Sequence, residues 1–494
     1  MKAKSKKRVD IMLIEVGVFV LIAVTPLLNY NRIMASLPLI SQAEAEEYKK
    51  HDFATNIAPY ISLTNNYNNS LKALITSADV LPNGYTFANI PDGLGAARNN
   101  SNVIDIFVNH ELENDTYHDG FSKVSKLTMR QNNAAIIDAE SIIIGSEGYK
   151  RLCSALLVEG YGFEHPVFLT NEEVEDGIVL AIDTANNSII QMPWLGEFSH
   201  ENTIHVPYFY NTINKTVVLS FEDGDATESE VYMYISDTPK DLLSGKGQLY
   251  VFGAENKNGY NTWNDIYHSN GTVNGEFIPL RWNHSTQNAT DLDNEAIAAG
   301  AFQFIRPEDG AMDKRKAFEN FLYLADTGND VDESDQPIQV GSNGQNWTNG
   351  RIYKFVFTDS NDPTKATFQV MMDGNDPATL GYNFIKNPDN MDTSQKSLMI
   401  QEDRIDANHQ NVTSPYDIKQ NAKIIHVDLN NTNQIEPIAY VNQQANLTSK
   451  HGEWESSGIL DVSDFFGDGT WLTTVQAHSL KEEGQLLLLN ITGS

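Results

Sequence analysis

Short apolar stretches, separated by asparagine, aspartate and glycine, dominate the chain after Glu47. In residues 123–130 apolar and polar side chains alternate, which is typical of a strand with one buried face. Helical periodicity is scarce, and its best short candidates are residues 70–78 and 292–302. The other predicted strands are residues 104–110, 166–170, 178–183, 215–221, 231–235, 248–252, 318–325, 351–358, 368–372, 397–400, 423–429, 435–441, 471–476 and 485–490.

Many short strands with turn residues between them predict an all-β fold. For a chain of 494 residues, repeated four-stranded blades in a β-propeller fit better than a single sandwich. No low-complexity linker divides the chain after its N-terminal segment, so we expect residues 47–494 to form one domain. The polar stretches 256–275 and 326–341 are expected to be loop insertions within it.

Several apolar strands end in an acidic or amide residue. These endings are Glu111, Glu172, Glu222, Asp326, Glu402 and Gln476. If each of these strands is the innermost of its blade, the propeller has six blades and the endings converge on one mouth of the central channel. Their spacing exceeds the about 40–50 residues of a common blade, so long loops are expected. Carboxylates gathered there would repel one another and would need cations. Alternatively, the acids lie on separate surface turns.

Residues 304–310 combine an arginine, a proline and two acids. Arg306 can fork onto a carboxylate or a phosphate, whereas Glu308 and Asp309 can bind a hard cation. The same residues could equally form an exposed turn closed by Gly310. Cys153 is the one cysteine, so no intrachain disulfide can form. An isolated thiol of this kind is usually buried, but it is also the only soft metal ligand of its type in the chain.

The chain carries 34 basic against 66 acidic residues, a formal charge of −32. Such a surface repels nucleic acid and anionic lipid, which excludes both as partners. It attracts cations instead. An anionic substrate would need local positive charge from a bound metal or from arginine.

The N-terminus has the pattern of an export signal. Lysines and Arg8 precede an apolar run over residues 11–28, and small residues follow at Ser41, Ala43 and Ala45. Residues 1–46 are therefore a cleaved signal peptide or an uncleaved membrane anchor, which would be the only membrane contact. Either way the remaining chain is extracytoplasmic. Asn-x-Ser/Thr sequons agree with export and glycosylation; they begin at Asn68, Asn99, Asn114, Asn186, Asn214, Asn270, Asn283, Asn288, Asn346, Asn411, Asn430, Asn446 and Asn490.

Several acids, one thiolate and one arginine together suit metal-assisted hydrolysis of a phosphate ester. Carboxylates bind calcium and, with a thiolate, can hold iron. The sequence contains no G-x-S-x-G, H-E-x-x-H or P-loop motif that would indicate another nucleophile or phosphate site.

A set of short motifs, in this order along the chain, resembles the PhoX-type alkaline phosphatases. The motifs are Asn109-His110-Glu111, Arg151-Leu152-Cys153-Ser154-Ala155, Thr170-Asn171-Glu172-Glu173, Leu195-Gly196-Glu197-Phe198-Ser199-His200-Glu201, Phe221-Glu222-Asp223-Gly224, Arg306-Pro307-Glu308-Asp309, Asn387-Pro388-Asp389-Asn390 and Ile400-Gln401-Glu402-Asp403. Members of that family are exported phosphomonoesterases built as β-propellers with an iron–calcium cluster. The region after Asn430 resembles the family weakly, apart from Trp454-Glu455-Ser456-Ser457-Gly458 and Val475-Gln476-Ala477-His478. Glu197 stands where relatives tend to have arginine.

The resemblance implies a Ca²⁺ and Fe³⁺ cofactor set and a small-molecule phosphate ester as substrate. Cys153 would ligate iron, and Glu172 or Glu173, Glu222 and Glu308 would hold iron and calcium. Arg306 and Asn109 would contact the phosphate. The strand endings Glu111, Asp326 and Glu402 complete the predicted metal ligands. A lysine that the family uses near the C-terminal end of its site has no assigned counterpart in this chain.

Other functions fit part of this pattern. A non-catalytic, calcium-stabilised surface propeller with a binding or structural role would suit the acidic surface and the sequons equally well. A phosphodiesterase or phytase-like enzyme could use the same kind of site. Cys153 and Arg306 favour the phosphatase, because a structural calcium site needs neither.

Overall fold

Antiparallel strands make up most of the regular structure in the computed structural model of the protein. The structure describes residues 52–64, 70–114, 120–224, 229–254, 272–328, 349–374, 385–403, 421–443, 454–478 and 483–491. The predicted export segment, residues 1–46, and most of the predicted insertions 256–275 and 326–341 lie outside these residues. Within the described part, no helix is both long and apolar enough to span a membrane.

The strands assemble into sheets whose neighbours are mostly consecutive in sequence. The first two blades are β3 (Pro91–Asn100), β4 (Val103–Glu113), β5 (Phe121–Arg130) and β6 (Ile136–Ile143), then β7 (Leu152–Val158), β8 (Val167–Glu172), β9 (Val179–Asp183) and β10 (Ser188–Met192). Blades 3 and 4 are β11 (His200–His205), β12 (Thr216–Glu222), β13 (Val231–Ser236) and β14 (Gly247–Ala254), then β16 (Pro307–Met312), β17 (Phe321–Asp326), β18 (Arg351–Phe357) and β19 (Lys365–Asp373). They form one nine-stranded sheet because β15 (Val273–Pro279) pairs with both β14 and β19.

The last two blades draw strands from both ends of the described chain. Blade 5 contains β20 (Pro388–Thr393), β21 (Ser397–Glu402), β22 (Lys423–Asp428) and β23 (Ile435–Val441), and blade 6 contains β24 (Trp454–Asp461), β25 (Thr470–Ala477) and β26 (Glu483–Asn490). Two early strands add to their outer edges: β1 (Ile61–Leu63) pairs with β23, and β2 (Ser70–Thr76) pairs with β26. The pairing of β2 with β26 closes the ring.

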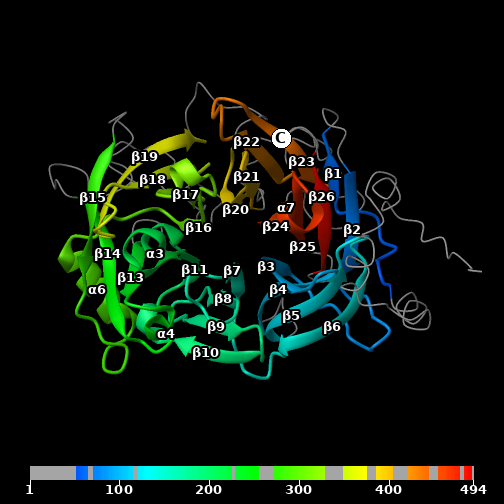
Figure 1. The fold of residues 1–494 in the computed structure, drawn as a ribbon, viewed down its shortest axis with the longest axis horizontal. Coiled ribbons are helices and arrows are strands. Elements are labelled where there is room, and N and C mark those ends of the chain that lie inside the picture. The colour runs from blue at the N-terminus through cyan, green and yellow to red at the C-terminus, as the bar shows by residue number, and fades with distance from the viewer. Residues whose placement is uncertain are drawn as a thin grey trace, which may run out of the picture. The chain divides into compact units, whose positions relative to one another are not determined.

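The first strand of each blade lies at the centre of the ring (Figure 1). These inner strands contact one another in the cyclic order β3, β7, β11, β16, β20, β24 and back to β3. Counting the nine-stranded sheet as two blades, the described residues form six blades. The all-β propeller class predicted from the sequence is therefore confirmed.

Apolar side chains fill the spaces between neighbouring blades. The buried residues divide into six clusters, each drawn mainly from two adjacent blades. Between blades 1 and 2, for example, Phe107 stacks on Phe168 with ring centroids 5.4 Å apart. Removal of this apolar surface from water is the main force that holds the blades together.

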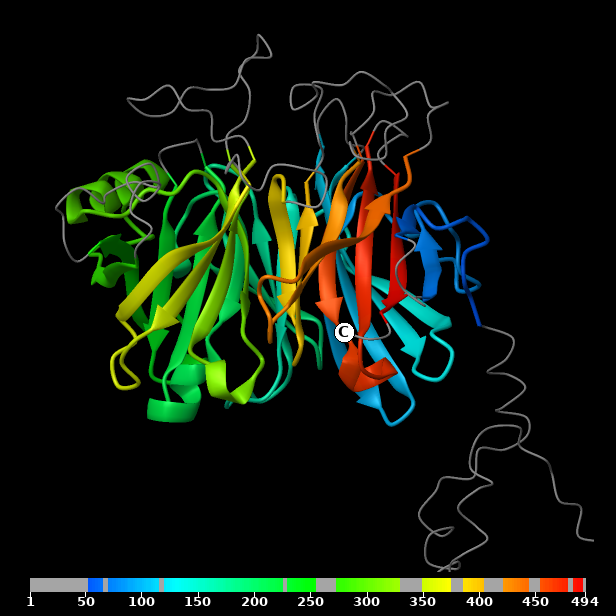
Figure 2. The same ribbon diagram turned by 90° about the horizontal axis from the view of Figure 1, so that it is seen from above.

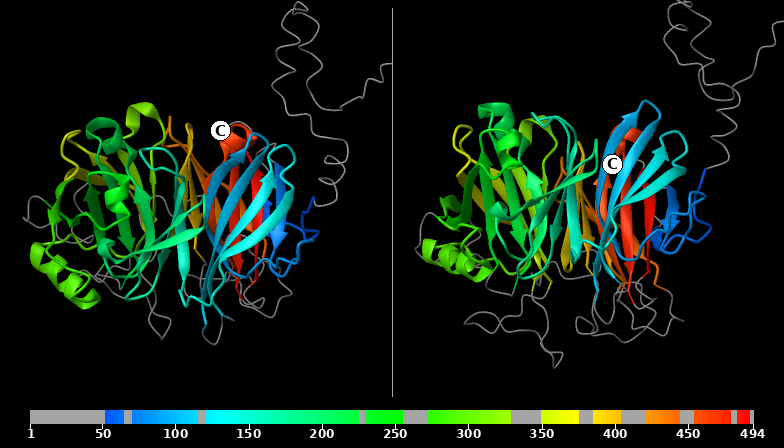
Figure 3. Two further views of the ribbon diagram at one scale, coloured as in Figure 1. Left: turned by 60° about the horizontal axis from the view of Figure 1, so that its bottom comes forward. Right: turned by 90° about the horizontal axis from the view of Figure 1, so that it is seen from below.

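The strands run along the axis of the ring (Figures 2 and 3). Because they are antiparallel, every inner strand begins at the end where the second strand of its blade finishes. We call this the site end. At the opposite end lie the short helices α3 (Pro207–Ile213), α4 (Pro239–Leu242) and α7 (Ser463–Phe466). Each directly follows a strand that runs away from the site end, namely β11, β13 or β24.

The two predicted helices have different outcomes. The first is wrong, because residues 70–76 form strand β2. Periodicity cannot distinguish a helix from a strand in so short an apolar run. Its pairing with β26 makes it a strand. The second is confirmed with shifted bounds as α6 (Ala289–Ala299). Asn288 caps its start by accepting from the Asp291 N–H, and Gly300, with φ of 93°, ends it.

The acid-ended strands are not the innermost ones, which corrects the sequence-based expectation. Glu111, Glu172, Glu222, Asp326, Glu402 and Gln476 lie on β4, β8, β12, β17, β21 and β25, the second strand of each blade. The stretch 304–310 also differs from the predicted turn, because Pro307 already begins the inner strand β16.

Candidate metal centre

The second residue of every inner strand is an acid or the cysteine. These residues are Asp92, Cys153, Glu201, Glu308, Asp389 and Glu455. In blades 1 to 5 the register to the second strand shifts at this point. Leu152 pairs with Glu172 but Ala155 pairs with Thr170, so Cys153 and Ser154 together lie opposite one residue. Such a bulge bends the strand locally and re-aims its side chains.

Seven residues from blades 1 to 5 form three overlapping groups of possible metal ligands. Within each group one ligand atom per residue lies within 4.8 Å of the others. The groups are Asp92, Glu111 and Cys153, then Cys153, Glu173 and Glu201, then Glu201, Glu308 and Asp389. Because Cys153 and Glu201 are shared, the three groups form one continuous cluster.

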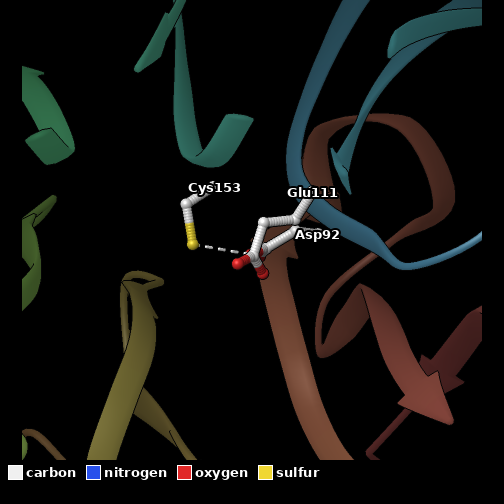
Figure 4. Close-up of side chains that lie close together, drawn as sticks. All are labelled: Asp92, Glu111 and Cys153. Atoms are coloured by element: carbon white, nitrogen blue, oxygen red, sulfur yellow. Dashed lines mark hydrogen bonds between the residues drawn. The ribbon is translucent and has the colours of Figure 1, made fainter. Parts of the chain in front are cut away.

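The first of these groups lies between two blades (Figure 4). The carboxylates of Asp92 and Glu111, from β3 and β4, face the thiol of Cys153 from β7. The Cys153 thiol donates to Asp92 Oδ2 at 3.0 Å, and the Gly458 backbone N–H donates to Asp92 Oδ1 at 3.2 Å. Blade 6 thus supports this group, although it adds no member to it.

Burial makes the cluster electrostatically unfavourable without cations. Loss of hydration raises the pKa of Asp92 to about 7 and that of Glu173 to about 8, with Glu111 adding repulsion to both. Burial, and then the neighbouring Asp92 carboxylate, also raises the pKa of the Cys153 thiol. Burial is also the main cause of the raised pKa values of Glu201 and Asp389. Bound cations would reverse these shifts.

The donor set fits metal ions of two kinds. Two groups contain the thiol and carboxylates, a combination that suits a transition metal such as iron. The third group, Glu201, Glu308 and Asp389, has oxygen donors only, which suits a hard cation such as calcium.

Neutral polar side chains lie next to the cluster and fix it. Ser154 donates to Glu201 Oε1 at 2.9 Å and accepts from Asn390 Nδ2 at 2.6 Å. Since Ser154 and Asn390 belong to β7 and β20, which are not neighbours in the ring, this second hydrogen bond crosses the axis. The Asn171 amide also donates to the Ser154 backbone carbonyl at 3.0 Å. These bonds hold the inner strands in one arrangement.

Arg306 lies beside the third group in a fixed orientation. Its Nε donates to Asp223 Oδ1 and its Nη2 to Asp223 Oδ2, both at 2.7 Å. The same Nη2 lies 3.5 Å from Glu308 Oε1. A guanidinium held by a forked pair keeps its direction, so Asp223 positions Arg306 at the edge of the cluster.

The structure brings together only part of the predicted metal set. Glu111, Cys153, Glu173 and Glu308 are members of the three groups. Asn109 is buried beside them, donating to the Cys153 carbonyl at 2.5 Å and accepting from Thr170 at 3.0 Å. The assignment of these residues as metal and phosphate ligands stays a prediction.

The other four predicted ligands lie on second strands and belong to none of the groups. Three of them accept a hydrogen bond from the backbone N–H two residues before the inner strand of their blade: Lys150 to Glu172 at 3.0 Å, Ile305 to Asp326 at 3.2 Å, and Lys386 to Glu402 at 2.8 Å. These acids therefore fix the turns that lead into the inner strands.

Two of these four acids have close charged neighbours away from the cluster. Glu402 is fully buried and pairs with Lys423 Nζ at 2.7 Å. Glu222 accepts from the Glu230 backbone N–H at 3.2 Å, and burial together with the Glu230 carboxylate raises its pKa. Their role as metal ligands is a prediction that rests on sequence alone.

Sequence reasoning assigned no role to Asp92, Glu201 or Asp389. One signal could have found two of them. A proline followed by an acid begins three inner strands, at Pro91-Asp92, Pro307-Glu308 and Pro388-Asp389. Proline at the first residue of a strand is common, so this repeated pair marks equivalent positions in the blades.

The fold and the cluster together define a β-propeller with a buried acid–thiol centre. A sequence model of the family described as alkaline phosphatase PhoX matches residues 146–453. This match covers more than half of the chain, so the protein belongs to the PhoX alkaline phosphatase family. Asp92 and Glu111 lie outside the matched range.

Comparison with solved structures finds a similar fold in an alkaline phosphatase. PhoX of Pseudomonas fluorescens, in complex with vanadate, a transition state analogue, aligns with a TM-score of 0.63 and 16% identity over 89% of this chain and 97% of that chain. At this identity the likeness shows the shared fold. A luciferin-regenerating enzyme aligns with a TM-score of 0.37 and 10% identity over 86% of this chain and 96% of its own, too low to carry an argument. A search of curated proteins gave no match.

The raised pKa values predict how stability depends on pH. In an unfolded chain the carboxyl groups of Asp92 and Glu173 have pKa values of about 4. Since the folded values are about 7 and about 8, the ion-free folded protein binds more protons, and its free energy of unfolding falls as pH rises through that range. After chelation, we expect a lower thermal midpoint at about pH 8 than at about pH 5. Calcium should raise the midpoint more at the higher pH. Equal midpoints with and without calcium at both pH values would contradict this.

Proposed function

We propose that the protein is an exported, metal-dependent phosphatase that hydrolyses phosphate monoesters at the cluster on the ring axis. One observation carries the proposal: a continuous set of seven possible carboxylate and thiol ligands, five buried and two (Glu111 and Asp389) half-buried, lies beside an arginine held in a fixed direction. Family membership supports phosphatase chemistry, and the Pseudomonas fluorescens relative binds a transition state analogue.

The ligand set we propose for Fe³⁺ comprises Asp92, Glu111, Cys153, Glu173 and Glu201. For Ca²⁺ we propose Glu201, Glu308 and Asp389. The bound ions would polarise the phosphoryl oxygens and activate the attacking oxygen. Asp92, Glu201 and Asp389 are added to the set predicted from the sequence, whereas Glu172, Glu222, Asp326 and Glu402, which belong to none of the groups, are left out of it.

Arg306 would bind the phosphoryl oxygens of the ester. A guanidinium offers several donors in one plane, a geometry that matches the oxygens of a phosphate. Asp223 fixes the guanidinium plane before substrate arrives, which lowers the entropy lost on binding. Asn109 would assist through its amide, in addition to holding the Cys153 carbonyl.

The export of the chain remains a proposal from the sequence. Residues 1–46 would direct export as a signal peptide or an anchor, and the domain over residues 47–494 would work outside the cytoplasm. A non-catalytic, calcium-stabilised surface propeller is the alternative. The mixed thiol–carboxylate groups argue against it, because structural calcium sites use oxygen ligands alone.

The direct test is elemental analysis of the purified protein together with turnover of a chromogenic phosphate monoester. We expect iron and calcium to copurify with the protein and the monoester to be hydrolysed. A phosphodiester should be hydrolysed more slowly. Calcium alone, with no turnover before or after iron is added, would favour the non-catalytic propeller.

Substitution of Cys153 by serine tests the thiolate ligand. Serine keeps a donor to Asp92, so the fold and its thermal midpoint should change little. A serine hydroxyl stays protonated at neutral pH and binds iron more weakly than a thiolate does. Iron content should therefore fall, and monoester turnover should drop by about a hundredfold or more. Iron content is measured on the folded variant. Unchanged iron and turnover would refute the ligand assignment.

Replacing Arg306 with alanine tests phosphate recognition. The variant should keep its metal ions and lose about tenfold to a thousandfold in kcat/KM, because one transition-state donor is removed. Arg315→Ala is a matched control: Arg315 forms the same forked pair with Asp313 at the opposite end of β16. The control should retain normal kinetics. Loss of metal in the Arg306 variant would mean that the arginine is structural.

A further inference from the structure

A second arginine lies at the position equivalent to Arg306. Arg151 directly precedes inner strand β7, as Arg306 directly precedes β16. At the same position blades 1, 3 and 5 have Ile90, Ser199 and Asn387, which carry no charge. Within the described residues, two cations therefore flank the cluster from blades 2 and 4, with the small Ser199 of blade 3 between them.

The backbone turn at this position belongs to the blade, not to the arginine. Arg151 has a left-handed φ of 43°, and Ile90 and Asn387 share it with φ of 45° and 44°. A left-handed conformation is unfavourable for arginine, so the residue is not there for local backbone reasons. This conformation is common to blades 1, 2 and 5, whereas Arg306 of blade 4 does not adopt it, so the two arginines are equivalent in their place before the inner strand and not in backbone conformation.

The hydrogen bonds of Arg151 leave much of its guanidinium unused. Nη2 alone makes its contacts, with both Glu173 oxygens at 2.6 and 2.7 Å and with Glu111 Oε1 at 3.2 Å. Nε is buried without a hydrogen-bond partner, and the hydrogen bonds of the guanidinium to the described residues come from Nη2. The side chain is 38% exposed, against 19% for Arg306, so an anion from solution can reach it.

These contacts put Arg151 beside the cations of the proposed enzyme. Glu111 and Glu173 both belong to the ligand groups that contain Cys153. Once cations occupy those groups, the carboxylates are neutralised and the guanidinium is left next to positive charge. An anion bound to its unused donors would compensate both.

We propose that Arg151 is a second phosphate-binding residue, acting with Arg306, and that the pair favours dianionic monoesters over monoanionic diesters. This inference rests on the proposed function. Two fixed cations attract a dianion about twice as strongly as a monoanion, since Coulomb energy scales with charge. Arg151 thereby adds specificity to a site whose metal ions bind either anion.

The test is the variant Arg151→Gln, with Arg151→Lys beside it. Inorganic phosphate should bind the metal-loaded glutamine variant about tenfold to a hundredfold more weakly than the wild type in calorimetry. Its kcat/KM should fall more for a monoester than for a diester. Metal content should stay unchanged, and the lysine variant, which keeps the charge without the fork, should be intermediate. Arg315→Gln is the control and should match the wild type.

Other outcomes separate this inference from the proposed function. Unchanged phosphate affinity in the glutamine variant would overturn it. The inference would also be overturned if the glutamine variant lost its metal ions while the lysine variant bound phosphate as tightly as the wild type. Arg151 would then be only a counter-ion for Glu111 and Glu173. If the wild type binds phosphate through Arg151 but hydrolyses no monoester, the proposed function fails, and with it the ester preference, while phosphate binding by Arg151 stands. If the wild type does not bind phosphate, both fail.

Discussion

Mutual repulsion among the buried acids on the ring axis is the constraint on which the rest of the structure depends. Asp92, Glu173, Glu201 and Glu308 are buried and Asp389 is half-buried, so water screens their charges poorly. Proteins bury such groups only when they are paired, hydrogen-bonded or bound to metal. The cluster is therefore suited to cations, and we propose that the arginines at its edge bind an anion that completes the charge balance.

The propeller provides the rigidity that this arrangement needs. Each blade contributes one inner strand, and apolar clusters between the blades fix the inner strands relative to one another. Bulges at equivalent positions turn the ligand residues toward the axis. Second-strand acids such as Glu172 and Asp326 then hold the turns that lead into the inner strands. Ligand positions thus depend on packing throughout the ring.

Sequence patterns identified the outer parts of the blades but none of the inner strands. Stretches such as 123–130 alternate because one face meets a neighbouring blade and the other meets solvent or a polar partner. Inner strands such as His200–His205 and Pro388–Thr393 face the axis with polar residues and carry a bulge, so they lack a period of two. The residues that carry the chemistry were therefore the hardest to place as structure, although they were visible as motifs.

The sequence by itself determined the all-β propeller class and the family resemblance, and it singled out Cys153, Arg306 and Glu308 as candidate site residues, because these depend on local patterns and short motifs. Tertiary structure decided which acids meet. Asp92 and Asp389 are almost three hundred residues apart in the chain, yet they belong to one cluster because the ring closes through β2 and β26. Glu172 and Glu402 lie at the same end of the ring, but each is the last residue of the second strand of its blade. The order of strands within the blade therefore keeps them away from the axis.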